Sequence, residues 1–129
     1  MTMQIMAALF VEGMDMRQVP GPSTRIDLMG VFFSLPLDTF PTTITPHLVV
    51  FVRAHADDAG TATLESVFTR DGEQIARNVQ PALVEPGKFG RLLVRPELEF
   101  TEPGTIEARC RIVESESTVV VPLTALPAP

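Results

Sequence analysis

Residues 104–113 read GTIEARCRIV, and this stretch shows most clearly what kind of fold the chain adopts. Apolar side chains occupy every second position: Ile106, Ala108, Cys110 and Ile112. The positions between them carry charge: Glu107, Arg109 and Arg111. Because successive side chains of a β-strand point to opposite faces, the pattern predicts a strand with one face in the core and one in solvent.

Similar short segments occur along the rest of the chain, separated by turn residues. They predict eight strands, at residues 3–11, 25–35, 47–56, 62–70, 73–80, 89–95, 104–113 and 117–124. Asp71-Gly72 lies between two of them and is a strong hairpin signal. No window shows a long helical apolar stripe, and residues 81–87, the best helical candidate, are too few to matter.

The whole pattern predicts an all-β chain. We expect a single antiparallel β-sandwich of seven or eight strands over residues 1–129, similar to an immunoglobulin or fibronectin type III module. Two stretches are expected to be loops. One covers residues 12–24 and contains Pro20-Gly21-Pro22, and the other covers residues 36–46 and is expected to carry the chain from one sheet to the other.

The charge balance bears on partners. The chain has ten Lys and Arg residues and 16 Asp and Glu residues, which gives a net charge of −6. Nucleic acids and anionic membranes are bound through clustered cations, so we expect neither as a partner. Residues 5–11 are apolar, but no positive charge precedes them as it would in a secretory signal, and we expect a cytoplasmic protein. The single cysteine, Cys110, agrees with a reducing compartment.

Side chains that carry chemistry are sparse, so we expect no catalytic residue, no metal ligand and no cofactor. His47 and His55 are too far apart on one extended strand to share a metal. Cys110 falls on the apolar face of its strand and is expected to be a buried, unreactive thiol. The sequence contains no nucleophile elbow, phosphate loop or dinucleotide fingerprint. An enzyme would need a pocket of convergent polar groups that the sequence does not indicate.

Two strands are apolar on both faces, which suggests that each needs cover on both sides. In residues 47–56, Leu48, Val50, Val52 and Ala54 share one face. Val49 and Phe51 lie on the opposite face, and Val31 and Phe33 have the corresponding place in residues 25–35. These four side chains are the candidate interface. A loop such as residues 36–46 could cover them, or a second copy of the chain could.

A second candidate site is the densest group of cations, Lys88, Arg91 and Arg95. Arg91 and Arg95 share a strand parity, and the group could receive an anion or an acidic partner. The alternative is a solvent-facing strand whose cations pair with acidic neighbours such as Glu97 and Glu99.

Several sequence pieces resemble a family of short bacterial proteins of unknown function. The pieces are AALFV at residues 7–11, IDLMGVF at 26–32, FP at 40–41, PHL at 46–48, RDGE at 70–73 and FTEPG at 100–104. The resemblance implies an immunoglobulin-like β-sandwich and implies no activity and no functional residue.

These observations favour a non-catalytic protein-interaction module, self-associating through a sheet face. The alternative is a domain that binds a small ligand or anion through the cations at residues 88–95.

Overall fold

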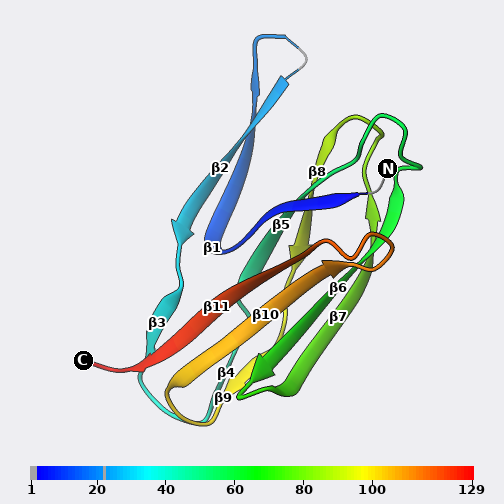
Figure 1. Cartoon of the computed structure of the whole chain (residues 1–129). Coiled ribbons are helices and arrows are strands. Elements are labelled where there is room, and N and C mark those ends of the chain that lie inside the picture. Colours follow the sequence, from blue (N-terminus) through cyan, green and yellow to red (C-terminus); the bar gives the residue numbers. More distant parts are fainter. Residues whose placement is uncertain (1–2, 22) are drawn as a thin grey trace.

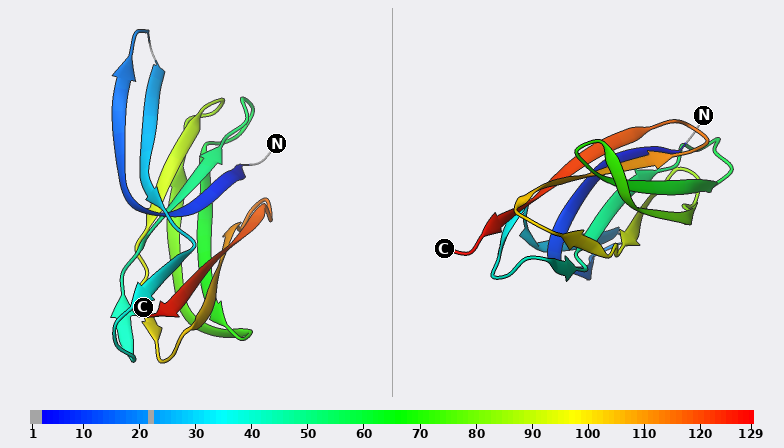
Figure 2. Two further views of the ribbon diagram at one scale, coloured as in Figure 1. Left: turned by 90° about the vertical axis from the view of Figure 1, so that its left-hand side faces the viewer. Right: turned by 90° about the horizontal axis from the view of Figure 1, so that it is seen from below.

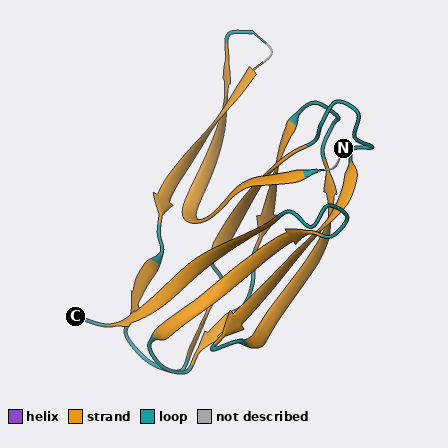
Figure 3. Cartoon of the chain, in the orientation of Figure 1, coloured by secondary structure: helices purple, strands orange, loops and turns teal. Residues whose placement is uncertain are grey.

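The computed structural model describes residues 3–21 and 23–129, and these form strands joined by turns and loops, without a helix (Figures 1 and 3). In chain order the strands are β1 (Gln4–Val19), β2 (Ser23–Val31), β3 (Ser34–Leu37), β4 (Thr42–Ile44), β5 (His47–Arg53), β6 (Thr61–Arg70), β7 (Glu73–Leu83), β8 (Phe89–Val94), β9 (Leu98–Phe100), β10 (Gly104–Ile112) and β11 (Thr118–Pro127). The expected all-β class is confirmed. Among the described residues there is no helix that is long and apolar enough to cross a membrane.

Two sheets make up most of the structure (Figure 2). One has four strands in the order β2-β1-β5-β8, and the other has five in the order β3-β11-β10-β6-β7. β4 and β9 form a small third sheet. The arrangement fits a β-sandwich. The pairing is antiparallel as expected, except that β3 runs parallel to β11.

The core lies between the two sheets and follows the alternation seen in the sequence. From β10, Ile106, Ala108, Cys110 and Ile112 are all fully buried. The four-stranded sheet supplies Phe10 of β1 and Leu48, Val50 and Val52 of β5, which are also fully buried. The period of two therefore assigned the inner faces of both strands correctly.

The hairpin predicted at Asp71-Gly72 is confirmed. Arg70 pairs with Glu73, and both turn residues have positive φ, 51° and 79°. Such a turn has a twist that matches the flanking strands, and Gly at its second position carries no steric cost.

Residues 12–24 were expected to be a loop, and that expectation is wrong for most of them. β1 continues to Val19 and β2 begins at Ser23, so the two strands form a long hairpin; Pro22 lies outside the described residues. Residues 36–46 do carry the chain between sheets, since β3 belongs to the five-stranded sheet and β5 to the four-stranded one. They also contain the short strand β4, which the three prolines concealed.

β1 pairs with a different neighbour along each half of its length. Gln4–Val11 pair with β5, and Val11–Val19 pair with β2. The change comes beside Gly30, which has a φ of 62°, and a Cβ placed on Gly30 would overlap the side chain of Glu12. Glycine is favoured there because the left-handed backbone disfavours any side chain, and any side chain would also require the flexible Glu12 side chain to move.

Leu48 is fully buried in the core, so shortening its side chain is expected to cost much stability. We expect Leu48→Ala to lower the free energy of unfolding by about 2–5 kcal/mol, because it removes apolar contacts and leaves a cavity. Urea denaturation followed by circular dichroism measures this. Leu83→Ala is the matched control, since Leu83 is 69% exposed. Equal costs for the two variants would contradict the assigned core.

β1 bends where it changes partner (Figure 1). The left-handed backbone at Gly30 beside this bend predicts that Gly30→Ala destabilises the chain by more than about 1 kcal/mol, because alanine disfavours positive φ. Thermal unfolding measures the loss. Gly104→Ala is the control, since Gly104 has open space around it and no positive φ. If the two substitutions shifted the unfolding temperature equally, the bend would not depend on Gly30.

Candidate functional site

The hairpin of β1 and β2 extends beyond the body of the sandwich (Figures 1 and 2). We call its paired residues, 13–19 and 23–29, the arm. Met14 pairs with Leu28 and Met16 pairs with Ile26, so one face of the arm is apolar. Asp15, Arg17, Arg25 and Asp27 occupy the opposite face. Arg17 Nε donates to Asp27 Oδ2 across this polar face at 2.7 Å.

A groove of about 610 Å³ lies between the arm and the outer surface of β5 and β8. One side is lined by Met16, Thr24, Arg25 and Ile26 of the arm, and the other by Phe51 of β5 and by residues 87–91. The apolar face of the arm therefore turns toward the sheet and forms one wall of the groove. We call this the arm groove.

The arm groove has an apolar lining with a cation that bridges its two sides. Phe51 is half-buried, and Phe89 is 70% exposed. Arg91 of β8 reaches across to the arm, where its Nε lies 2.9 Å from Met16 Sδ and donates to it. A thioether is a weak acceptor, so most of the hydrogen-bonding capacity of the guanidinium remains unused by this contact.

The cations of the arm groove have different surroundings. Lys88 Nζ lies 3.0 Å from Glu85 Oε2, in an exposed ion pair. For Arg91, no carboxylate of residues 3–21 or 23–129 lies within ion-pair distance. Arg25 also lines the arm groove, but the strand register places it on the polar face of the arm with Asp15, Arg17 and Asp27. Lys88 and Arg91 are therefore the lining cations on the sheet side of the arm groove.

The structure brings together two of the three cations of the candidate anion site. Lys88 and Arg91 line the arm groove, but Arg95 lies beyond the end of β8 and lines a different hollow with Arg77 and Asn78 of β7. Strand parity could not anticipate this separation because β8 ends at Val94. The expected partners of these cations, Glu97 and Glu99, are replaced by Glu85 beside Lys88.

The candidate interface also divides. Val49 was expected to be available to a partner, but it is 1% exposed and therefore is not. It shares a hollow of about 370 Å³ with Met14, Met29 and Leu93, and the arm is what covers it. Phe51 faces the arm groove, whereas Val31 and Phe33 are 43% and 51% exposed.

A second surface lies beside the arm groove on the same sheet. Val31 stands opposite Val11, and Leu93 stands opposite Val49, which in turn stands opposite Leu9. Each of the four strands therefore carries an apolar side chain on this face, although Val11 and Val49 are themselves buried. Met29, Val31 and Leu93 are its exposed members, each more than two-fifths exposed. We call these three residues the sheet-face patch.

The arm was not anticipated from the sequence, although a signal for it exists. Apolar residues alternate on both sides of Pro20-Gly21, as Met14 and Met16 before it and Ile26 and Leu28 after it. This alternation around a turn is typical of a hairpin.

Other potentially reactive side chains make contacts that stabilise the fold. Cys110 is fully buried, Ser66 Oγ donates to its sulfur at 3.7 Å, and burial raises the pKa of the thiol. The carboxylate of Glu114 accepts from the Thr63 N–H and hydroxyl, which lowers the pKa of Glu114. Within the described ranges, no group of three or more His, Cys, Asp or Glu is placed to hold a metal ion.

No protein-family model matches the chain, and no curated protein matches it. Solved structures do resemble it. A mutant beta-glucosidase from Listeria innocua in complex with laminaribiose aligns with a TM-score of 0.53 and 14% identity, over 94% of this chain and 16% of that chain. The same enzyme in complex with glucose gives 0.52 at 14% identity, over 92% and 16%. This chain therefore corresponds to a small part of that enzyme, and the likeness shows the fold alone.

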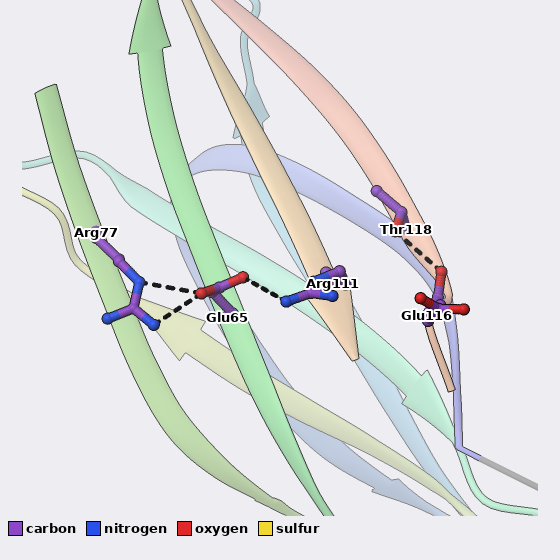
Figure 4. Close-up of polar contacts among 5 residues, drawn as sticks. All are labelled: Glu65, Arg77, Arg111, Glu116 and Thr118. Carbon is purple, nitrogen blue, oxygen red and sulfur yellow. Dashed lines mark hydrogen bonds and ion pairs between the residues drawn. The ribbon is translucent and has the colours of Figure 1, made fainter. Parts of the chain in front are cut away.

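The outer face of the five-stranded sheet carries an ion network instead of a groove (Figure 4). Glu65 of β6 lies between two arginines of neighbouring strands. Its Oε2 accepts from Arg77 of β7 at 2.8 Å, and its Oε1 accepts from Arg111 of β10 at 3.0 Å. Both arginines lower the pKa of Glu65, and the hydrogen bond from Arg77 has the larger effect. Each oxygen already has a partner, so the network ties three strands together.

This network predicts a pH-dependent cost for Glu65→Gln. A carboxylate whose pKa is lowered on folding stabilises the fold above its ordinary pKa, and that stabilisation is lost as the pH falls through the folded-state pKa. We therefore expect Glu65→Gln to lower the unfolding temperature at pH 7, with a difference that shrinks as the pH drops below the ordinary glutamate range. Glu102→Gln is the control, since Glu102 is exposed and forms no ion pair within the described residues. A difference that stayed constant with pH would contradict the assignment.

Proposed function

We propose that this chain is a non-catalytic interaction module with an immunoglobulin-like sandwich, and that it self-associates through the sheet-face patch. The observation that carries the proposal is the exposure of three apolar side chains on one sheet face, Met29 and Val31 of β2 and Leu93 of β8. Soluble monomers expose apolar residues singly, whereas a contiguous patch is typical of an interaction surface.

The strand arrangement supports the immunoglobulin-like type. If β2, β3, β4 and β9 are set aside, seven strands remain. They form a three-stranded sheet, β1-β5-β8, and a four-stranded sheet, β11-β10-β6-β7. Seven antiparallel strands divided between two packed sheets are the frame of such sandwiches. In this interpretation the arm is an addition to the first strand of the frame.

The composition of the arm groove supports a binding role over a catalytic one. Its lining, as described above, contains cations and apolar side chains but no His, Cys, Ser, Asp or Glu. General acid–base and nucleophilic catalysis depend mostly on those residue types. Thr24 and Lys88 are the lining side chains that could act in such chemistry, and neither shares the lining with a His, Asp or Glu that could serve as its base.

Self-association is the form of interaction that the sheet-face patch supports best. Two copies related by a twofold axis can place the same patch against itself, which lets one apolar surface cover another. Met29 and Leu93 lie around a shallow hollow beside Val49, so each copy offers both a projecting side chain and a place to receive one.

The test is sedimentation velocity of the purified chain from low to high micromolar concentration. We expect the sedimentation coefficient of the wild type to rise with concentration and that of Leu93→Asp to remain that of a monomer, because a buried carboxylate without a partner is costly. Leu83→Asp is the matched control, since Leu83 is exposed at the end of β7 on the other sheet, and it is expected to behave as wild type. A wild type that is monomeric throughout, or a Leu93→Asp variant that associates equally well, would overturn self-association.

A further inference from the structure

We infer that the arm groove binds a singly charged organic anion with an apolar body, of the medium-chain carboxylate class. This inference does not depend on self-association, because the residues that carry it lie outside the sheet-face patch. It rests on three features of the arm groove: its size, the state of Arg91, and the division of its lining into a cationic and an apolar part.

The size fits a small organic ligand. Ligand pockets in proteins have volumes of about 300–1,000 Å³, and they are mostly apolar with a few placed polar groups. The arm groove, at about 610 Å³, is within that range. Because the arm forms one wall and the sheet forms the other, an inserted alkyl or aryl body is covered from two sides.

Arg91 is the group that would hold the anion. Its Nε is engaged by the Met16 sulfur, which fixes the guanidinium between the arm and β8. Its two terminal nitrogens are free to donate in parallel to the two oxygens of a carboxylate, a geometry for which arginine is well suited. A ligand carboxylate placed there would be the first carboxylate partner of Arg91, because none of the described residues supplies one.

The charge of the ligand follows from the surrounding groups. Lys88 already has Glu85 as a counter-ion, and the chain as a whole carries a net charge of −6. A polyanion would be repelled by the overall charge, and a doubly charged phosphate would find part of the local cationic charge neutralised. A monocarboxylate matches the charge that Arg91 offers.

The apolar body would lie along Phe51, Ile26 and the side of Met16. Phe51 lines the arm groove from β5, and Ile26 lines it from the arm. Covering Ile26, which is 37% exposed, and Phe89, which is 70% exposed, would remove apolar surface from water. Such burial favours binding in proportion to the area covered, so a carboxylate without an apolar body should bind poorly.

The test compares three probes: octanoate, octan-1-ol and acetate. Each is titrated into the ¹⁵N-labelled chain, and amide chemical shifts are followed by NMR, since the chain has no Trp or Tyr to report by fluorescence. We expect octanoate to shift the amides of residues 87–91 and to bind roughly tenfold more tightly than octan-1-ol, the factor that a charge-assisted hydrogen bond contributes. Acetate is expected to cause no saturable shift.

Two variants assign the site. Arg91→Gln is expected to weaken octanoate binding roughly tenfold while leaving octan-1-ol unchanged, because it removes the charge and keeps most of the side chain. Arg95→Gln is the matched control, since it removes a cation of the same segment that lies in a different hollow, and it is expected to bind octanoate as wild type does.

The titration is repeated in Leu93→Asp, so that the two proposals can fail separately. Loss of self-association with octanoate binding intact would leave the arm groove site standing. The inference is overturned if octanoate and octan-1-ol bind equally, if neither shifts the amides of residues 87–91, or if Arg91→Gln and Arg95→Gln have the same effect.

Discussion

The divided pairing of β1 is the constraint on which the rest of the structure depends. One half of the strand pairs with β5 inside the sandwich, and the other half pairs with β2 in the arm. The first half, with Met3 just before it, is also tied to the turn between β10 and β11, because Ile5 N donates to Ser117 Oγ at 3.0 Å and Ser115 Oγ donates to Met3 O at 2.6 Å. With that half fixed in the body, the bend beside Gly30 sets the direction of the arm. The arm in turn creates the arm groove and covers Val49.

The outward-facing side chains of the two sheets have different kinds of partner. On the five-stranded sheet, Glu65 bridges two arginines from adjacent strands, so both of its carboxylate oxygens are paired within the sheet. On the four-stranded sheet, apolar residues continue outward across β5 and β8, and Arg91 has a sulfur as its partner. A carboxylate with both oxygens paired needs no further partner, whereas exposed apolar surface beside a cation that lacks a carboxylate favours one. This difference is why both proposals concern the four-stranded sheet.

The sequence predicted more of the fold than of the site. Residues 104–113 and 47–56 show the core face directly, because side-chain alternation is a local property of a strand, and every position on the predicted core faces, 106, 108, 110 and 112 and 48, 50, 52 and 54, is buried. The turn at Asp71-Gly72 was predictable for the same reason, since two positive φ angles demand such residues. The strand at residues 12–19 was missed because its charged and apolar residues belong to an arm, which has solvent on one face. Arg95 was misplaced because the position at which β8 ends depends on packing that parity does not record.

The sequence by itself determined the class of fold, the inner faces of its main strands and the inert character of Cys110. These depend on spacing along one strand or on one residue's neighbours within it. The tertiary structure alone decided that Phe51, Lys88 and Arg91 meet Met16, Arg25 and Ile26. Those two groups come from distant parts of the chain, and they meet because β1 changes partners and bends back over the sheet. Pairing between distant strands is set by the packing of the whole chain, which no single segment specifies.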